Sequence, residues 1–239
     1  MLDKLAGHVR RCLDDYKMIK QGETIAVGVS GGKDSLTLLC ALAELSKYHP
    51  AEFKVHAVTL DMGIKGMDFS PIKELCKKLE IPLTLKFSDI ARIIFDERKE
   101  KNPCSLCATM RRAALCNMVT ELGIKKIALA HHYDDAVETF LLSLLYEGRI
   151  HCFQPVTYLS RTDVTQIRPM LYVEEKFIKS FIKLKKLQVV QNPCPENGES
   201  KREEIKNLIK TLGIEHKDIK SKLFGAIKRL PIKGWEVED

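Results

Sequence analysis

The stretch TIAVGVSGGKDS, residues 24–35, decides the fold. Its first half, residues 24–29, is short, apolar and rich in β-branched side chains, which is typical of a buried strand. After residue 35, leucines recur at the spacing of one helix face, at positions 38, 39, 42 and 45. Residues 30–35 therefore form a tight loop that joins a strand to a helix.

The same alternation continues along the chain. We expect further strands at 53–60, 83–87, 124–130 and 188–190, and helices at 1–20, 70–79, 106–122, 137–145, 174–187 and 199–212. Strands that alternate with helices predict an α/β fold, a parallel sheet with helices on both faces. Ligands of such sheets bind beyond the carboxyl ends of the strands. The predicted organisation is an N-terminal helix (1–22), an α/β domain (23–190) and a C-terminal segment with helices (191–239).

The composition of the 239 residues is ordinary for a globular protein, with 45% hydrophobic and 30% charged residues. No apolar run is long enough to cross a bilayer, which excludes a transmembrane protein. The first residues lack an apolar signal segment, so we expect a cytoplasmic protein without a membrane partner. The net charge of +7 favours polyanionic partners.

The loop at 30–35 has the properties of a phosphate-binding site. Gly31 and Gly32 let the backbone turn tightly and approach a ligand, while Lys33, Ser30 and Ser35 add a positive charge and hydroxyl donors. The following helix contributes unpaired N–H groups and the positive end of its dipole. The pattern lacks the spacer of the Walker motif and differs from the dinucleotide fingerprint. The alternative is a plain strand-to-helix turn capped by Ser or Asp.

Three of the eight cysteines are candidates for a metal centre. Cys104 and Cys107 form a Cys-x-x-Cys pair at the start of a predicted helix, and Cys194 lies between two prolines much later in the chain. A structural zinc site normally has four protein ligands, so three cysteines without an obvious fourth favour a 4Fe–4S cluster with one open iron. A redox dithiol, or a zinc site completed by a histidine, is the alternative.

The other cysteines carry no such signal. Four of them lie in helical patterns, at positions 12, 40, 76 and 116. Buried structural cysteine is common and unreactive, so we expect these four to pack in the core. The role of Cys152, in an irregular stretch, stays open.

Basic residues gather in two regions. Five lysines crowd the predicted helix at 174–187, and six arginines and lysines lie near the first cysteines, between residues 92 and 112. Such clusters suit an RNA phosphate backbone. The alternative is a solvated helix face, because the lysine helix lacks interleaved aromatic residues for base stacking.

The Ser-Gly-Gly-Lys-Asp-Ser loop after the first strand resembles the PP-loop of the ATP pyrophosphatases. A second stretch, AHHYDDAVET at residues 130–139, resembles a motif of the tRNA-modifying branch of that superfamily. The resemblance implies that domain 23–190 binds ATP, with contacts from residues 30–35, Ala130 and Asp135. It further implies that Asp135 faces the nucleotide near Mg²⁺, and that Lys33, Asp34, Arg111 and Asp135 take part in catalysis. A zinc site at the two histidines has no supporting ligand spacing.

The cysteine triplet, the Thr109–Arg112 stretch and IRPML at 167–171 together resemble the tRNA-cytidine 2-thiolation enzymes, the TtcA family. The resemblance implies an ATP-dependent tRNA sulfurtransferase that adenylates a pyrimidine C2 oxygen. Sulfur then arrives through a 4Fe–4S cluster on Cys104, Cys107 and Cys194. The implied partners are tRNA and a sulfur donor, either a cysteine desulfurase or free sulfide, and a homodimer is plausible. The alternatives are a lysidine-type tRNA ligase with a structural metal and a nucleotide-binding redox sensor without turnover.

Overall fold

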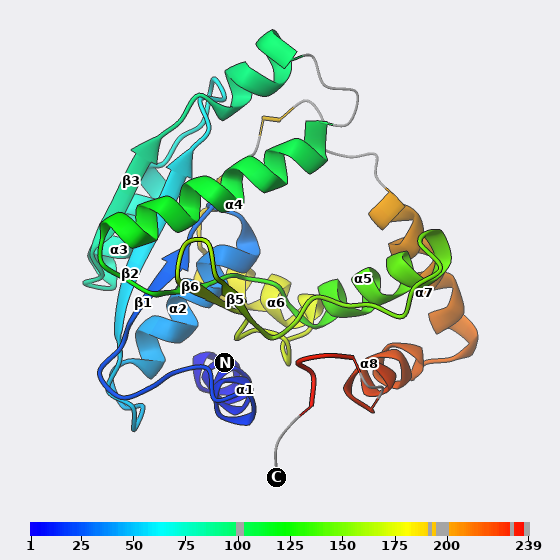
Figure 1. Cartoon of the computed structure of the whole chain (residues 1–239). Helices are drawn as coiled ribbons and strands as arrows, with labels where there is room; N and C mark the ends of the chain where they lie inside the picture. Colours follow the sequence, from blue (N-terminus) through cyan, green and yellow to red (C-terminus); the bar gives the residue numbers. More distant parts are fainter. Residues whose placement is uncertain (99–102, 191–192, 195–200, 230–231, 237–239) are drawn as a thin grey trace.

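The computed structural model describes residues 1–98, 103–190, 193–194, 201–229 and 232–236. Its centre is a six-stranded sheet in the order β3-β2-β1-β4-β6-β5 (Figure 1). All neighbouring strands run parallel except β5 and β6, which are antiparallel. The strands are β1 (Thr24–Gly28), β2 (Lys54–Asp61), β3 (Leu83–Phe87), β4 (Lys126–Ala128), β5 (Val156–Leu159) and β6 (Val164–Ile167).

Helices cover both faces of the sheet, as predicted. They are α1 (Leu2–Asp15), α2 (Lys33–Leu45), α3 (Ser70–Lys78), the π-helix η1 (Arg92–Arg98), α4 (Pro103–Glu121), α5 (Tyr133–Tyr146), α6 (Glu175–Lys185), α7 (Lys201–Glu215) and α8 (Ile219–Arg229). Successive strand residues point to opposite faces. Ile25 and Val27 of β1 therefore pack in the core with α1 and α2, while Ala26 packs in a smaller core with Cys116 and Val119 of α4.

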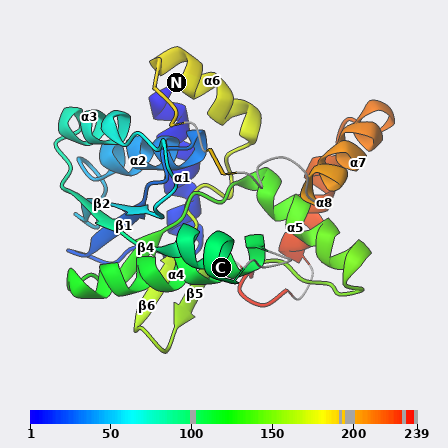
Figure 2. The same ribbon diagram turned by 90° about the horizontal axis from the view of Figure 1, so that it is seen from above.

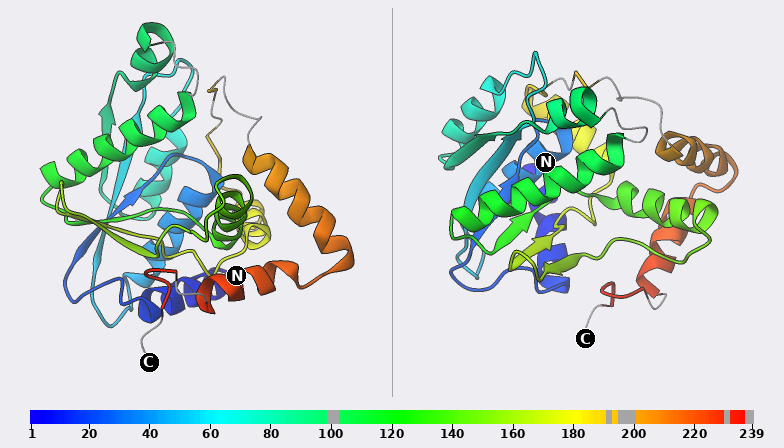
Figure 3. Two further views of the ribbon diagram at one scale, coloured as in Figure 1. Left: turned by 45° about the vertical axis from the view of Figure 1, so that its right-hand side comes forward. Right: turned by 45° about the horizontal axis from the view of Figure 1, so that its top comes forward.

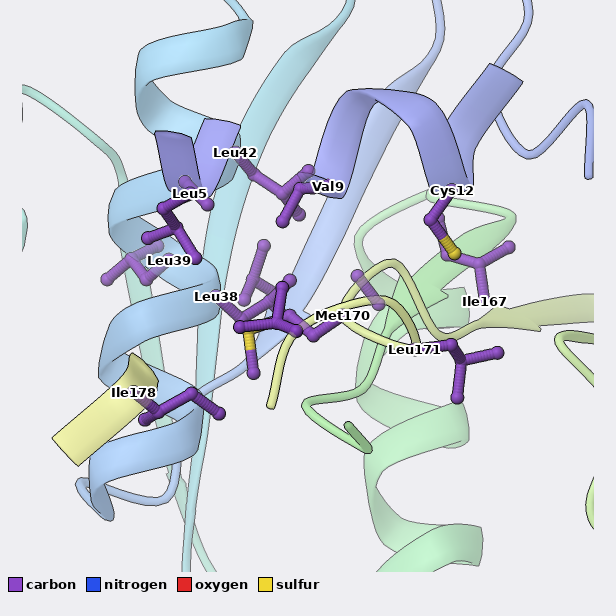
Figure 4. Close-up of a cluster of buried hydrophobic side chains, with 14 of the residues drawn as sticks. Leu5, Val9, Cys12, Leu38, Leu39, Leu42, Ile167, Met170, Leu171 and Ile178 are labelled. Carbon is purple, nitrogen blue, oxygen red and sulfur yellow. The ribbon is translucent and has the colours of Figure 1, made fainter. Parts of the chain in front are cut away.

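The larger core lies between α1, α2 and the segment after β6 (Figure 4). Val9, Leu38 and Leu42 are fully buried there, together with Ile178 of α6. Cys12 also packs in this core, and burial raises the pKa of its thiol far above the ordinary value. The prediction for the cysteines at 12, 40, 76 and 116 is confirmed, because each is at most 8% exposed.

The predicted strand at 188–190 is wrong. Val190 donates one backbone hydrogen bond to Gly31 O, at 3.0 Å, and no strand forms there. The fifth and sixth strands are instead β5 and β6, a short hairpin that sequence analysis missed. Because β5 is the outermost strand and pairs antiparallel with β6, the sheet has one antiparallel edge. Four-residue strands give too short an alternation to stand out from loop sequence.

Helices α5, α7 and α8 form a group beside the sheet (Figures 2 and 3). Phe224 of α8 stacks on Tyr133 at the start of α5, with ring centroids 4.1 Å apart. Trp235 is fully buried against Phe224 and Tyr16, and its indole N–H donates to Phe153 O at 2.8 Å. None of the described helices combines the length and apolar character needed to cross a membrane.

Candidate functional site

The loop after β1 is held in shape by its own serines. Ser35 Oγ donates to Gly32 O at 2.9 Å, and the Ser30 N–H donates to Ser35 Oγ at 3.2 Å. Gly32 is the N-cap of α2, and Gly31 has a φ of +83°, a conformation that strongly favours glycine. The turn therefore aims the N-terminus of α2, with its unpaired N–H groups, at the space beyond β1.

A cavity of about 440 Å³ lies at this point. The neighbouring strands β1 and β4 end beneath it, which is where the strand order of the sheet switches direction. Its wall includes the predicted loop residues Ser30, Gly32, Asp34 and Ser35, with Ala130 from beyond β4. The volume and the polar loop suit a nucleotide. We name it the nucleotide cavity.

Val190 packs against Gly31 of this loop and lines the nucleotide cavity. A Cβ atom added to Gly31 would lie 2.5 Å from Val190 Cγ2, which is closer than real side chains approach. Gly31 itself does not line the nucleotide cavity. Only three residues separate Val190 from Cys194 in the sequence, so the contact with the loop and the third cysteine are close along the chain.

Lys33 does not line the cavity either, because its ammonium group is held by two carboxylates. Its Nζ lies 3.0 Å from Asp34 Oδ2 and 3.1 Å from Glu175 Oε1, at the start of α6. Burial alone would raise the pKa of Glu175, but the hydrogen bonds from Lys179 and Lys33 outweigh it and lower the pKa to about 2. This ion pair ties α6 to the loop.

The carboxylates of Asp34 and Asp135 both lie near the imidazole ring of His132. His132 Nε2 lies 3.6 Å from Asp34 Oδ1 and 3.6 Å from Asp135 Oδ2. Asp135 caps α5, since its Oδ2 accepts the His132 N–H at 2.9 Å, and its Oδ1 faces Arg202 at 3.3 Å. Asp34 Oδ1 is buried without a hydrogen-bond partner among the described residues. A free carboxylate oxygen on the cavity wall fits Mg²⁺ bound between the protein and phosphates.

His131 is a wall residue of the nucleotide cavity that sequence analysis gave no role. Its ring packs on Phe153, with centroids 4.9 Å apart. Burial, helped by the nearby positive charge of Arg168, lowers the pKa of His131 to about 4. The imidazole is therefore neutral at physiological pH. Its Nδ1 is buried and has no hydrogen-bond partner among the described residues.

The three candidate cysteines line one cavity. Cys104 and Cys107, from the first turn of α4, and Cys194 share a space of about 210 Å³. The rest of its wall is mostly apolar and comes from η1 and the segment after β2, with Met62, Ile64, Ile90, Ile94 and Phe95. A π-helix is uncommon and is often found at functional sites. We name this space the cysteine cavity.

Arg111 and Met62 line both cavities, so the two spaces lie next to each other. Burial raises the pKa of the Cys107 thiol, whereas the charge of Arg111 acts in the opposite direction. Cys194 and Cys104 raise the pKa of Cys107 further, because thiolates close together repel. A cationic centre between the three sulfurs would remove this repulsion.

The cysteine cavity fits a 4Fe–4S cluster. Within the described parts of the chain, no three His, Cys, Asp or Glu side chains meet around one point where a single ion would bind. A cluster has different needs, because each thiolate binds a separate iron. Three thiols around an apolar space can hold three irons, and the described wall offers no His, Asp or Glu to the fourth.

Cys152 is not part of either cavity. It is 1% exposed, and its Sγ donates to Ala136 O at 3.5 Å. Burial raises the pKa of this thiol to about 12, so it stays protonated and unreactive. The open question about Cys152 is thereby answered in favour of packing.

Glu138, one turn into α5, gives the fold a pH dependence. The residue is 4% exposed, Arg202 Nε lies 3.7 Å from its Oε2, and burial raises its pKa to about 7 from an ordinary 4.5. Below pH 4.5 the folded and unfolded chains both bind this proton. Between pH 4.5 and 7 only the folded chain keeps it, so rising pH lowers stability, by about 3 kcal/mol at most. Glu138→Gln should remove this loss.

The measurement is urea unfolding of the wild type and of Glu138→Gln between pH 5 and pH 9. We expect the variant to gain stability relative to the wild type as the pH rises from 5 to 7, and the difference to stay constant above about pH 7. Glu203→Gln, on the exposed side of α7, is the matched control and should follow the wild type. Parallel pH curves for wild type and Glu138→Gln would contradict the assignment.

The structure thus brings together some predicted site residues and separates others. Ser30, Gly32, Asp34, Ser35, Ala130 and Arg111 line the nucleotide cavity, whereas Gly31, Lys33 and Asp135 stand behind its wall. Sequence analysis missed His131, Glu175, Arg202 and Val190. Only His131 had a usable signal, since it lies in the AHHYDDAVET motif. The other three reach the site through tertiary contacts that no local pattern reveals.

Comparison with known proteins gives consistent results. A family model described as PP-loop domain matches residues 2–212. The tRNA-cytidine(32) 2-sulfurtransferase of Pelobacter propionicus is 35% identical over 230 residues, which cover 95% of this chain and 86% of that protein. The enzyme of the same name from Syntrophotalea carbinolica is also 35% identical, over 95% of this chain and 87% of its own length.

Among solved structures, the U34-tRNA thiolase NcsA from Methanococcus maripaludis with its 4Fe–4S cluster is similar. The TM-score is 0.78 at 25% sequence identity, and the match covers 95% of this chain and 78% of that one. A thiolase that contains a cluster thus shares the arrangement of strands and helices described above.

Proposed function

This chain belongs to the PP-loop family and, within it, to the tRNA-cytidine(32) 2-sulfurtransferases, and from that membership we propose that it replaces the C2 oxygen of cytidine 32 in tRNA with sulfur at the expense of ATP. The observation that carries the proposal is the shared wall of the two cavities. Three thiols and a nucleotide-sized pocket meet at Arg111 and Met62. This juxtaposition is what a reaction needs that activates an oxygen and then displaces it with sulfur.

The first half of the reaction activates the base. ATP lies in the nucleotide cavity with its phosphates against the N–H groups of the 30–35 loop and the start of α2. The C2 oxygen of cytidine attacks the α-phosphorus, and pyrophosphate leaves with the bonding electrons. Asp34 would hold Mg²⁺, which would offset the charge that develops on the phosphates. Lys33 keeps Asp34 in place, and the neutral His131 orients the nucleotide by a hydrogen bond.

The second half replaces the activated oxygen. Cys104, Cys107 and Cys194 would hold a 4Fe–4S cluster, which would supply the sulfur chemistry of this half of the reaction. The C2–O bond breaks as the C2–S bond forms, and AMP leaves with the former C2 oxygen. Arg111, on the wall of both cavities, stabilises the negative charge of the departing AMP. The apolar wall from η1 excludes water, which would otherwise return cytidine.

The test is sulfur transfer by the anaerobically purified chain to unmodified tRNA, with ATP, Mg²⁺ and sulfide. Digestion and nucleoside mass spectrometry should detect 2-thiocytidine, and sequencing of the fragments should place it at position 32. One pyrophosphate should appear for each sulfur incorporated. Thiolated uridine, or pyrophosphate release without sulfur, would contradict the proposal.

Arg111→Ala should lower the rate of sulfur transfer about 100-fold, the loss expected when one charge-stabilising donor is removed. Iron content should stay close to that of the wild type, because Arg111 is not a thiol. ATP affinity should fall far less than the rate of sulfur transfer, because Arg111 lines the nucleotide cavity but is not part of the 30–35 loop. Arg112→Ala is the matched control, since it removes the same charge from the next residue of α4. Equal losses in both variants would assign the effect to general charge on this helix.

The setting of the reaction follows from its chemistry. We place it in the cytoplasm, where thiols stay reduced and tRNA is available. The sulfur donor is free sulfide or a cysteine desulfurase. The chain acts as a monomer or as a homodimer, and light scattering of the anaerobic protein separates the two.

A further inference from the structure

A third cavity, of about 430 Å³, lies between α5, α7 and α8, and the mechanism above does not use it. Its cationic wall consists of Lys206 and Lys210 on α7, Lys217 in the turn after α7, and Lys220 on α8. The apolar wall is formed by Val137, Ile209, Ile214 and Ile219. We name it the lysine cavity.

The three acidic residues in this wall already have cationic partners. Asp134 pairs with Lys220 and accepts the Glu175 N–H at 2.7 Å. Glu175 pairs with Lys33 and Lys179, and the buried Glu138 faces Arg202. By contrast, Lys206, Lys210 and Lys217 form no ion pair or hydrogen bond with any described residue. The charge of Lys206 acts on the buried Glu138, whereas Lys210 and Lys217 have no acidic partner among the described residues. The wall therefore keeps an excess of positive charge, so an anion is the occupant it favours.

The wall also contains an exposed apolar surface. Ile214 lines the cavity and is 76% exposed, so its apolar side chain is open to a ligand bound there. A side chain at Gly213 would meet nothing within 4 Å, so the space beside Ile214 is open. A ligand with both a phosphate and a flat apolar face, such as a nucleotide within an RNA chain, satisfies both the lysines and this surface.

The lysine cavity is connected to the nucleotide cavity through its acidic residues. Glu175 holds Lys33 of the 30–35 loop, and Asp134 Oδ2 lies 3.9 Å from His132 Nδ1, whose ring also faces Asp34. RNA bound here would thus lie one layer of side chains away from the ATP site. The lysine-rich helix α6 has no such connection through its lysines at 183, 185 and 186, which point to solvent.

We propose that the lysine cavity binds the phosphate and base of a tRNA nucleotide other than the one that is modified. This proposal rests on the proposed function, because it takes tRNA as the substrate. The 430 Å³ space has the size of a single-ligand pocket. The lysines hold the backbone, and Ile214 contacts the base without reading its sequence.

The experiment measures tRNA affinity, without ATP or sulfide, at several salt concentrations. The variant Lys206→Gln/Lys210→Gln/Lys217→Gln should bind tRNA about 10-fold to 100-fold more weakly than the wild type at physiological salt. The slope of log affinity against log salt should fall by about 2 to 3, close to one for each lysine. Ile214→Ser should weaken binding a few-fold, with no change in that slope.

The matched control is Lys183→Gln/Lys185→Gln/Lys186→Asn on α6, which removes the same charge. Asn replaces Lys186 because this residue has a φ of +51°, which Asn tolerates. The control should retain most of the affinity and slope. Equal losses in both triple variants, or a loss in the α6 variant alone, would overturn the proposal. An unchanged tRNA affinity with slower sulfur uptake from a protein donor would show that the cavity docks an acidic protein, and would also overturn it.

The two proposals fail in different ways. A chain that binds tRNA through the lysine cavity but transfers no sulfur contradicts the proposed function alone. A chain that thiolates tRNA, but whose affinity is indifferent to Lys206, Lys210 and Lys217, contradicts the lysine cavity alone.

Discussion

Cys194→Ser should lower the rate of sulfur transfer by more than about 100-fold, while the chain stays folded. A serine hydroxyl is a poor ligand for iron, so two thiols remain where the cysteine cavity has three. The anaerobic protein should lose its visible absorbance and most of its iron. Because Cys194 lies outside the hydrophobic core, the midpoint of thermal unfolding of the metal-free protein should not change.

The matched control is Cys40→Ala, which removes a thiol that is 8% exposed on α2, away from the cavity. This variant should keep its iron and its activity, at a small cost in stability. A Cys194→Ser protein with full iron content, or one that is colourless but fully active, would show that Cys194 does not hold a cluster.

Gly31→Ala should raise the dissociation constant for ATP more than about 100-fold and destabilise the fold. The left-handed backbone of Gly31 costs an alanine about 1 to 2 kcal/mol. The new methyl group would also lie 2.5 Å from Val190 Cγ2, and such overpacking costs a further 1 to 3 kcal/mol or so. To relieve the clash, the loop must leave the shape that aims its N–H groups at the phosphates. Calorimetric titration with ATP and urea unfolding measure the two effects.

Gly22→Ala separates backbone strain from the clash. Gly22 has a φ of +74°, but a Cβ there meets nothing within 4 Å. This control should lose about 1 kcal/mol of stability and bind ATP normally. In Gly31→Ala/Val190→Gly the obstructing side chain is gone, and part of the ATP affinity should return. If Gly31→Ala behaved like Gly22→Ala, the contact with Val190 would have no role in ATP binding.

Elements with a strong local pattern could be predicted from the sequence. The run at 24–29 and the leucines after it were sufficient to predict β1, α2 and the loop between them, and the family resemblance is confirmed by the comparisons. Elements defined by tertiary contacts could not be predicted. The β5–β6 hairpin is too short to show an alternation, and the π-helix η1 has no distinctive composition.

In the candidate site, too, residues in a local motif could be predicted from the sequence, whereas residues brought in by tertiary contacts could not. The loop serines and the three cysteines could be predicted from the sequence, because their chemistry is local and their spacing is unusual. Lys33 was predicted to act directly on phosphate, yet in the structure its charge is shared between Asp34 and Glu175. No pattern in the sequence connects residue 33 with residue 175, because the fold alone brings α6 to the start of α2. The roles assigned to individual residues stay predictions until the variants above are measured.

Three residues separate Val190 from Cys194, so a change at the proposed cluster site would be felt at the ATP-binding loop. Val190 packs against the loop proposed to bind ATP, and Cys194, which lines the cysteine cavity, comes shortly after it in the sequence. Thermodynamic linkage is reciprocal. If ATP binding favours one position of this piece of chain, then holding the chain in that position favours ATP binding by the same free energy. Under the proposed function, oxidative loss of the cluster would therefore also weaken ATP binding. A molecule that has lost its cluster would then bind ATP weakly and would not consume ATP in a sulfur transfer that it cannot complete.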